Sequence, residues 1–196
     1  MDIPKSCSYR RFIPFSKLIC SGNTTRFTSL CLTATAQNLG IWGAASTGTC
    51  SVLFGLTSDG YTVLRSKEIE GDVHSLVWSP NGRTLHALDS HSSISSTTSI
   101  TKFRISENPN LEDIVGIDLL ANVTSASQIV SHPIGNRLYL VTKDTNELIS
   151  VPLRDNALAD NSTQSLRYKL LPSNIDATQF YASSLALSAS RTTLWT

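Results

Sequence analysis

One phrase of this sequence occurs twice, and the repeat limits the folds open to the chain. The stretch "VHSLVWSPNGRTLHALD" at 73–89 is matched by "SQIVSHPIGNRLYLVT" at 127–142, where Pro133 follows Pro80 by 53 residues. The turn glycine and the leucine that follows it match at the same offset. A repeat of about 50 residues is typical of modular folds in which each unit packs against its neighbours.

Both copies have the composition of short β-strands joined by tight turns. Their apolar runs are short and rich in β-branched or aromatic residues, and turn formers separate them at 57–60, 79–82 and 132–135. Gly and Asn adopt positive φ easily and Pro fixes φ, which favours such turns. Because no segment shows sustained helical periodicity, we predict an antiparallel all-β chain.

Each repeat unit has room for four strands. In the first full unit we expect strands at 73–78, 84–89, 99–105 and 114–121. In the second we expect them at 127–131, 137–142, 147–153 and 166–171. Four strands in about 50 residues is the period of a propeller blade. A β-sandwich with accidental self-similarity is the alternative.

The blade count predicts an incomplete β-propeller of about three to three and a half four-stranded antiparallel blades. A third copy begins near the C-terminus, where Leu194 follows Leu138 by 56 residues, but its turn lacks Pro and Gly. Propellers typically have four to eight blades, so we expect open edges that favour self-association. After a poorly defined segment at 1–26, the partial propeller spans 27–196, with units near 27–66, 73–121, 127–171 and 182–196.

Composition and charge exclude several classes of function. The 196 residues include 16 basic and 15 acidic side chains, and this near balance argues against nucleic-acid binding. No apolar run approaches the roughly 18–20 residues that cross a bilayer, so we expect no membrane partner. With no export signal at the N-terminus, we predict a cytoplasmic location.

The cysteines give no sign of a metal site. Cys7, Cys20, Cys31 and Cys50 form no C-x-x-C pair, so we expect free thiols. The spacing therefore predicts no metal site, and because no motif for another cofactor is present we expect none.

The two repeated phrases resemble a known group of proteins. In "VHSLVWSPNGRTLHA" and "SHPIGNRLYLV" the chain is similar to the fungal carboxy-cis,cis-muconate cyclases, or 3-carboxymuconate lactonizing enzymes. These belong to the lactonase-type seven-bladed propellers, together with the 6-phosphogluconolactonases. The resemblance covers about 27–196 and is clearest over 73–153. It implies a cofactor-free isomerase of aromatic catabolism, whose substrate is a small anionic organic acid or lactone.

The repeat offsets bring three strand starts together at one mouth of a central channel. His74, Ser127 and Ser183 take the same place in successive blades. The resemblance implies that His74 is the catalytic acid or base, a task that suits an imidazole with an unperturbed pKa near 6.5. By the same resemblance, the family's two arginines fall on Ser127 and Tyr181, and its glutamate falls on Lys143. Together with Ser183, these positions are the candidate substrate-binding residues.

These replacements leave other functions open. Serine cannot replace the bidentate carboxylate clamp of an arginine. A catalytically inactive propeller that acts as a binding module is therefore one alternative, and a sugar-lactone hydrolase of the 6-phosphogluconolactonase type is another.

Other polar and aromatic residues have structural explanations. We expect His132 to serve the turn before Pro133, and His86 to be exposed or to lie on a strand face. We expect Trp42 and Trp78 to pack between blades.

Overall fold

The computed structural model describes the chain from Ser29 onward, with gaps. Backbone and side chains are described over 73–89, 98–104, 116–153 and 165–196. The strands between 29 and 72 and the strand residues near 105, 112–115, 154 and 157–158 are described by their backbone alone. The predicted segment 1–26 lies outside the described residues, as do the side chains of Trp42 and of the four cysteines.

The strands form consecutive antiparallel sheets, each built from neighbouring stretches of chain. The first sheet contains β1 (Ser29–Ala34), β2 (Ile41–Thr47), β3 (Cys50–Thr57), β4 (Gly60–Thr62) and β5 (Ile69–Glu70). The second contains β6 (Val73–Trp78), β7 (Thr84–Asp89), β8 (Ser99–Ile105) and β9 (Glu112–Leu119). The third contains β10 (Ala126–Ser131), β11 (Arg137–Thr142), β12 (Glu147–Arg154), β13 (Ala157–Leu158) and β14 (Leu166–Lys169). A hairpin of β15 (Ala186–Leu187) and β16 (Leu194–Trp195) follows.

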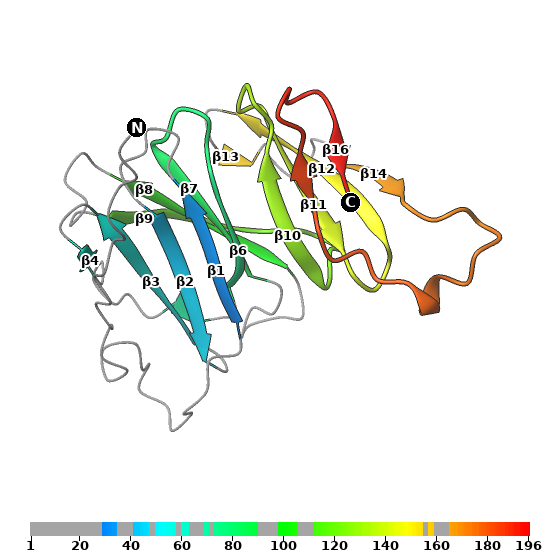
Figure 1. Ribbon diagram of the computed structural model, residues 1–196, viewed down its shortest axis with the longest axis horizontal. Helices are drawn as coiled ribbons and strands as arrows, with labels where there is room; N and C mark the ends of the chain where they lie inside the picture. The colour runs from blue at the N-terminus through cyan, green and yellow to red at the C-terminus, as the bar shows by residue number, and fades with distance from the viewer. Residues whose placement is uncertain are drawn as a thin grey trace, which may run out of the picture.

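The first strands of the three larger sheets lie next to one another. Strand β6 contacts both β1 and β10, and Figure 1 shows the sheets arranged side by side. Between β6 and β10, the amide of Ile129 donates a hydrogen bond of 3.3 Å to Oγ of Ser75. Successive four-stranded meanders joined through their innermost strands are the arrangement of propeller blades. The prediction of an incomplete all-β propeller is confirmed.

The inner hairpins of the second, third and fourth units each have a turn of the same type. The amides of Ser79, His132 and Ser188 donate to the carbonyl five residues on, at 2.8, 2.9 and 2.8 Å. In each turn one residue has positive φ, namely Gly82 (67°), Gly135 (76°) and Arg191 (59°). The third copy therefore forms the same turn without the Pro and Gly that made its sequence match weak.

The main difference from the predicted strands is β2, which the sequence did not predict. Its residues, "IWGAAST", include Ile, Trp and Thr at the ends, but the centre of the strand is a run of four small residues, "GAAS". The strand is set by pairing with β3 along its full length and with β1 over all but its last residue. Strand β9 also covers 112–119 rather than the predicted 114–121.

An apolar core joins the second and third sheets. Leu138 and Leu140 of β11 lie opposite Val151 and Ile149 of β12, and all four are buried on one face of the third sheet. They pack with buried residues of the second sheet and of the connection between the sheets, including Leu88, Ile100, Leu120 and Val123. Full burial of such a side chain stabilises the fold by about 1.5–3 kcal/mol. This core fixes how β10 lies against β6.

A buried polar group interrupts the apolar face of the second sheet. His86, fully buried on β7, lies directly opposite Lys102 of β8, whose Nζ is 2.6 Å from Oδ2 of Asp118. Burial, followed by the charge of Lys102, lowers the pKa of His86 from 6.5 to about 4, and Asp118 opposes the shift. The histidine lies on a strand face as predicted, but it is not exposed. Trp78 is 7% exposed, which agrees with its predicted packing role.

Candidate functional site

The candidate site lies where the inner strands β6 and β10 begin. His74 and Ser127 are each the second residue of their strand, and each coincides with a shift in strand register. Pairing steps from Val73 to Ser75 on β6 and from Ala126 to Gln128 on β10. A bulge leaves one residue unpaired in the ladder and re-aims its side chain. The two strands therefore repeat the same irregularity at the same place.

Ser127 contacts the chain segment that leads into the fourth unit. Its hydroxyl lies 3.3 Å from the carbonyl oxygens of both Val141 and Ala182, to either of which it donates. Ser183 is the residue after Ala182, so the Ser127 side chain lies beside the backbone that leads into Ser183. The latter is exposed and lies three residues before β15 rather than within a strand. His74, on the neighbouring strand β6, is half-buried.

Asn146 holds this segment against the third sheet. The residue is 3% exposed and has φ of 48°. Its Nδ2 donates to the carbonyls of Ala177 (3.2 Å) and Phe180 (2.9 Å). Its Oδ1 accepts from the amide of Ala182 at 2.8 Å. One buried amide thus satisfies three backbone groups of a segment more than thirty residues away.

Gln128 adds a second attachment beside Ser127. Its Oε1 accepts a hydrogen bond of 2.7 Å from the amide of Leu185, just before β15. Sequence reasoning did not single out Gln128 or Asn146. The one available signal was an asparagine in the turn between two predicted strands, since asparagine tolerates positive φ.

The segment held by Asn146 contains a short 3-10 helix, η2 (Ala177–Gln179). Asp176 caps this helix by accepting hydrogen bonds from the hydroxyl (2.7 Å) and the amide (3.0 Å) of Thr178. These bonds lower the pKa of the Asp176 carboxyl. Tyr181 follows the helix and is 70% exposed, so its side chain is open to solvent at this mouth.

Lys143 lies in the turn between β11 and β12, beside the chain that enters β10. Its amide donates to the carbonyl of Ser125 at 3.0 Å, and the hydroxyl of Ser125 donates to the carboxylate of Asp144. The side chains of Lys143 and Asp144 are exposed. The predicted charged position is therefore close to the strand start that carries Ser127.

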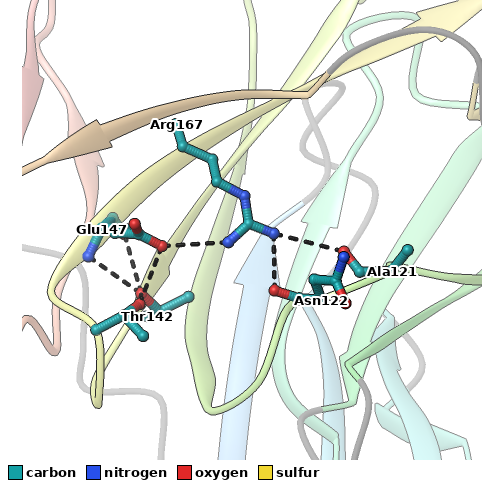
Figure 2. A network of polar contacts seen from close by, with 6 residues as sticks. Ala121, Asn122, Thr142, Glu147 and Arg167 are labelled. Carbon is teal, nitrogen blue, oxygen red and sulfur yellow. Dashed lines mark hydrogen bonds and ion pairs between the residues drawn. The ribbon is translucent and has the colours of Figure 1, made fainter.

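Arg167 of β14 ties the outer part of the third sheet to the connection that leads into β10 (Figure 2). Its Nη1 lies 3.3 Å from Oε2 of Glu147, and its Nη2 donates to the carbonyl of Asn122 at 2.7 Å. The amide of Glu147 in turn donates to the hydroxyl of Thr142 at 3.1 Å. The strand start, the turn and the incoming connection are thus held together by polar contacts.

A cavity of about 430 Å³ lies at the other end of the inner strands. It is lined by the last residues of β6 and β10 and by the inner turns, and includes Trp78 and Pro80. His74 precedes Trp78 by four residues, or roughly 13 Å along a strand. The cavity is therefore separate from the predicted site residues.

Within the described ranges, no group of three His, Cys, Asp or Glu side chains could hold a metal ion. No helix in the described part of the chain is long and apolar enough to span a bilayer.

Comparison with known proteins shows similarity in structure alone. No protein-family model matches the chain, and no curated protein matches it. A protein assigned as a 6-phosphogluconolactonase from Bacteroides uniformis matches with a TM-score of 0.60 and 17% identity, over 83% of this chain and 47% of that one. This Bacteroides uniformis protein shares the fold of this chain. The periplasmic gluconolactonase of Pseudomonas aeruginosa matches with a TM-score of 0.58 and 15% identity, over 84% and 48%. A Lactobacillus plantarum protein matches with a TM-score of 0.57 and 14% identity, over 83% and 46%.

The chain therefore spans about half the length of the solved structures it matches. The roles assigned to His74, Ser127, Lys143, Tyr181 and Ser183 stay predictions, as do self-association and a cytoplasmic location.

Proposed function

We propose that this chain forms part of a lactonase-type propeller that binds a small sugar lactone and hydrolyses it at the mouth where β6 and β10 begin. The observation that carries the proposal is the repeated bulge, which sets His74 and Ser127 at equivalent strand starts in a fold shared with gluconolactonases. Proteins that share a fold can have different activities, because the activity depends on the side chains at the site. The site must therefore be tested directly.

In the proposed hydrolysis, His74 is the general base. The imidazole takes a proton from water, whose oxygen attacks the lactone carbonyl carbon. The ring C–O bond then breaks, and the imidazolium returns the proton to the departing oxygen, which yields a hydroxy acid. The Ser127 hydroxyl, which now donates to backbone carbonyls, would donate to the lactone carbonyl oxygen. Lys143 supplies positive charge for an anionic substituent such as a phosphate.

The sequence phrases support a second candidate, the cyclisation of 3-carboxy-cis,cis-muconate. In that reaction a carboxylate closes on a double bond, and His74 donates the proton to the adjacent carbon. The proposal draws on the "HPIGNRLY" phrase and on the histidine of the preceding copy. It requires binding of three carboxylates, and Ser127 and Tyr181 stand where the family's arginines would.

A substrate assay separates these candidates. The purified chain of 196 residues is supplied with δ-gluconolactone, 6-phosphogluconolactone or 3-carboxymuconate, and proton release or ultraviolet absorbance is followed above the spontaneous rate. We expect turnover of a sugar lactone that falls about 10²–10⁴-fold in His74→Ala. His132→Ala is the matched control, because His132 lies in a turn at the opposite end of the inner strands. Turnover of 3-carboxymuconate alone would favour the second candidate. If the folded protein turned over none of the three substrates, both candidates would be wrong and the binding-module alternative would remain.

A further inference from the structure

The cavity at the far end of the inner strands has the properties of a ligand site that the proposed hydrolysis does not use. Its volume of about 430 Å³ falls within the range of small-molecule pockets, roughly 300–1,000 Å³. Its walls are largely apolar and come from three successive units, with Val77, Trp78, Pro80, Val130 and Leu187 among them. A small molecule with an apolar body fits such a surface.

The charge of the cavity points to an anion. Arg191 is the one charged side chain among its described lining residues, and no carboxylate is among them. The other polar side-chain groups of the lining are the hydroxyls of Ser79, Ser131 and Ser188 and the indole N–H of Trp78. An arginine at the edge of an apolar pocket can hold a carboxylate through two parallel N–H···O bonds.

The backbone at Arg191 is a separate observation in favour of a functional role. Arg191 occupies the turn position that is Gly82 and Gly135 in the two preceding units, and its φ is 59°. A side chain in this region is strained, and such strain is often retained at functional sites. The surrounding turn compensates, because Oγ of Ser188 accepts hydrogen bonds from the amides of Thr192 (3.2 Å) and Thr193 (3.1 Å). A strained cationic residue therefore stands where glycine would form the same turn without strain.

We propose that this cavity binds a small organic carboxylate. The apolar body lies against Trp78 and Val130, and the carboxylate pairs with the guanidinium of Arg191. The cavity is at the opposite end of the inner strands from His74, so a ligand bound there does not occupy the lactone site.

The test is a titration of the full chain with benzoate, followed by tryptophan fluorescence. We expect saturable binding, and at least tenfold weaker binding of benzamide, which has the same shape without the charge. Trp78→Phe identifies the reporting indole, because it should remove most of the signal change while Trp42 and Trp195 remain.

Arg191→Gly separates recognition from folding. It should weaken benzoate binding about 10- to 100-fold, as expected for loss of a charge-assisted pair. Its melting temperature should equal or exceed that of the parent chain, since glycine suits φ of 59°. Sugar-lactone turnover should be unchanged in this variant, so the two proposals can fail separately. Equal benzoate affinity in the parent and in Arg191→Gly would overturn the proposal, as would equal affinity for benzamide or the absence of saturable binding.

Discussion

Replacement of Asn146 tests whether one buried amide holds the segment at the candidate site. Asn146 makes three side-chain hydrogen bonds, of 2.8, 2.9 and 3.2 Å, to backbone groups between Ala177 and Ala182. A hydrogen bond contributes about 1 kcal/mol net. Because φ at Asn146 is 48°, glycine keeps the backbone unstrained. Asn146→Gly should therefore lower the free energy of unfolding by about 3 kcal/mol. Asn146→Ala should cost roughly 1 kcal/mol more, from the added backbone strain.

The chain contains a matched control for this experiment. Asn122 also has positive φ, 58°, but its side chain is exposed. Its carbonyl, which accepts from Arg167, is retained in glycine. Asn122→Gly should thus change the free energy of unfolding by less than about 0.5 kcal/mol, as expected for an exposed site.

Urea unfolding measures the global effect, and amide hydrogen exchange locates it. Exchange at Ala182 should speed up in Asn146→Gly well beyond the rise for the core amides of β11, because the amide of Ala182 loses its acceptor. If Asn146→Gly were as stable as Asn122→Gly, with unchanged exchange at Ala182, the assigned role of Asn146 would be wrong.

Two further predictions concern the core and the inner turns. His86 has a folded pKa of about 4 against an ordinary value of 6.5, so the unfolded chain binds its proton more tightly. The stability present above pH 6.5 should fall as pH drops towards 4, by roughly 3 kcal/mol in all. Between pH 6.5 and 5, His86→Leu should flatten this slope in urea unfolding, and an equal slope in both proteins would refute the effect. Gly135 has φ of 76°, and an added Cβ would lie 3.3 Å from Cδ of Pro80 in the neighbouring turn. Gly135→Ala should therefore lower the thermal unfolding midpoint, at a cost of about 1–3 kcal/mol, and an unchanged midpoint would show that the two turns have room to move apart.

The inner hairpins were predictable because their signals are local. Short apolar runs with β-branched or aromatic residues mark β6, β7, β10 and β11, while Pro and Gly mark the turns between them. The repeat offset aligned His74 with Ser127, and the structure places the same bulge at both. The fold class was therefore predictable from backbone preferences and the repeat period, because each of these strands forms mainly through its own residues and the turn next to it.

The remaining features depend on segments that are far apart in the chain. The centre of strand β2, "GAAS", has weak strand propensity, and its conformation is set by pairing with β1 and β3. The burial of His86 depends on the third sheet packing against the second, whereas the sequence left open whether this residue is exposed or lies on a strand face. Asn146 and Gln128 bind backbone groups from Ala177 to Leu185, contacts that no local pattern encodes. The sequence by itself therefore determined the inner hairpins, their turns and the blade period, through local dihedral preferences. The tertiary structure alone decided which side chains are buried and which distant backbone groups they hold, because those depend on how whole sheets pack.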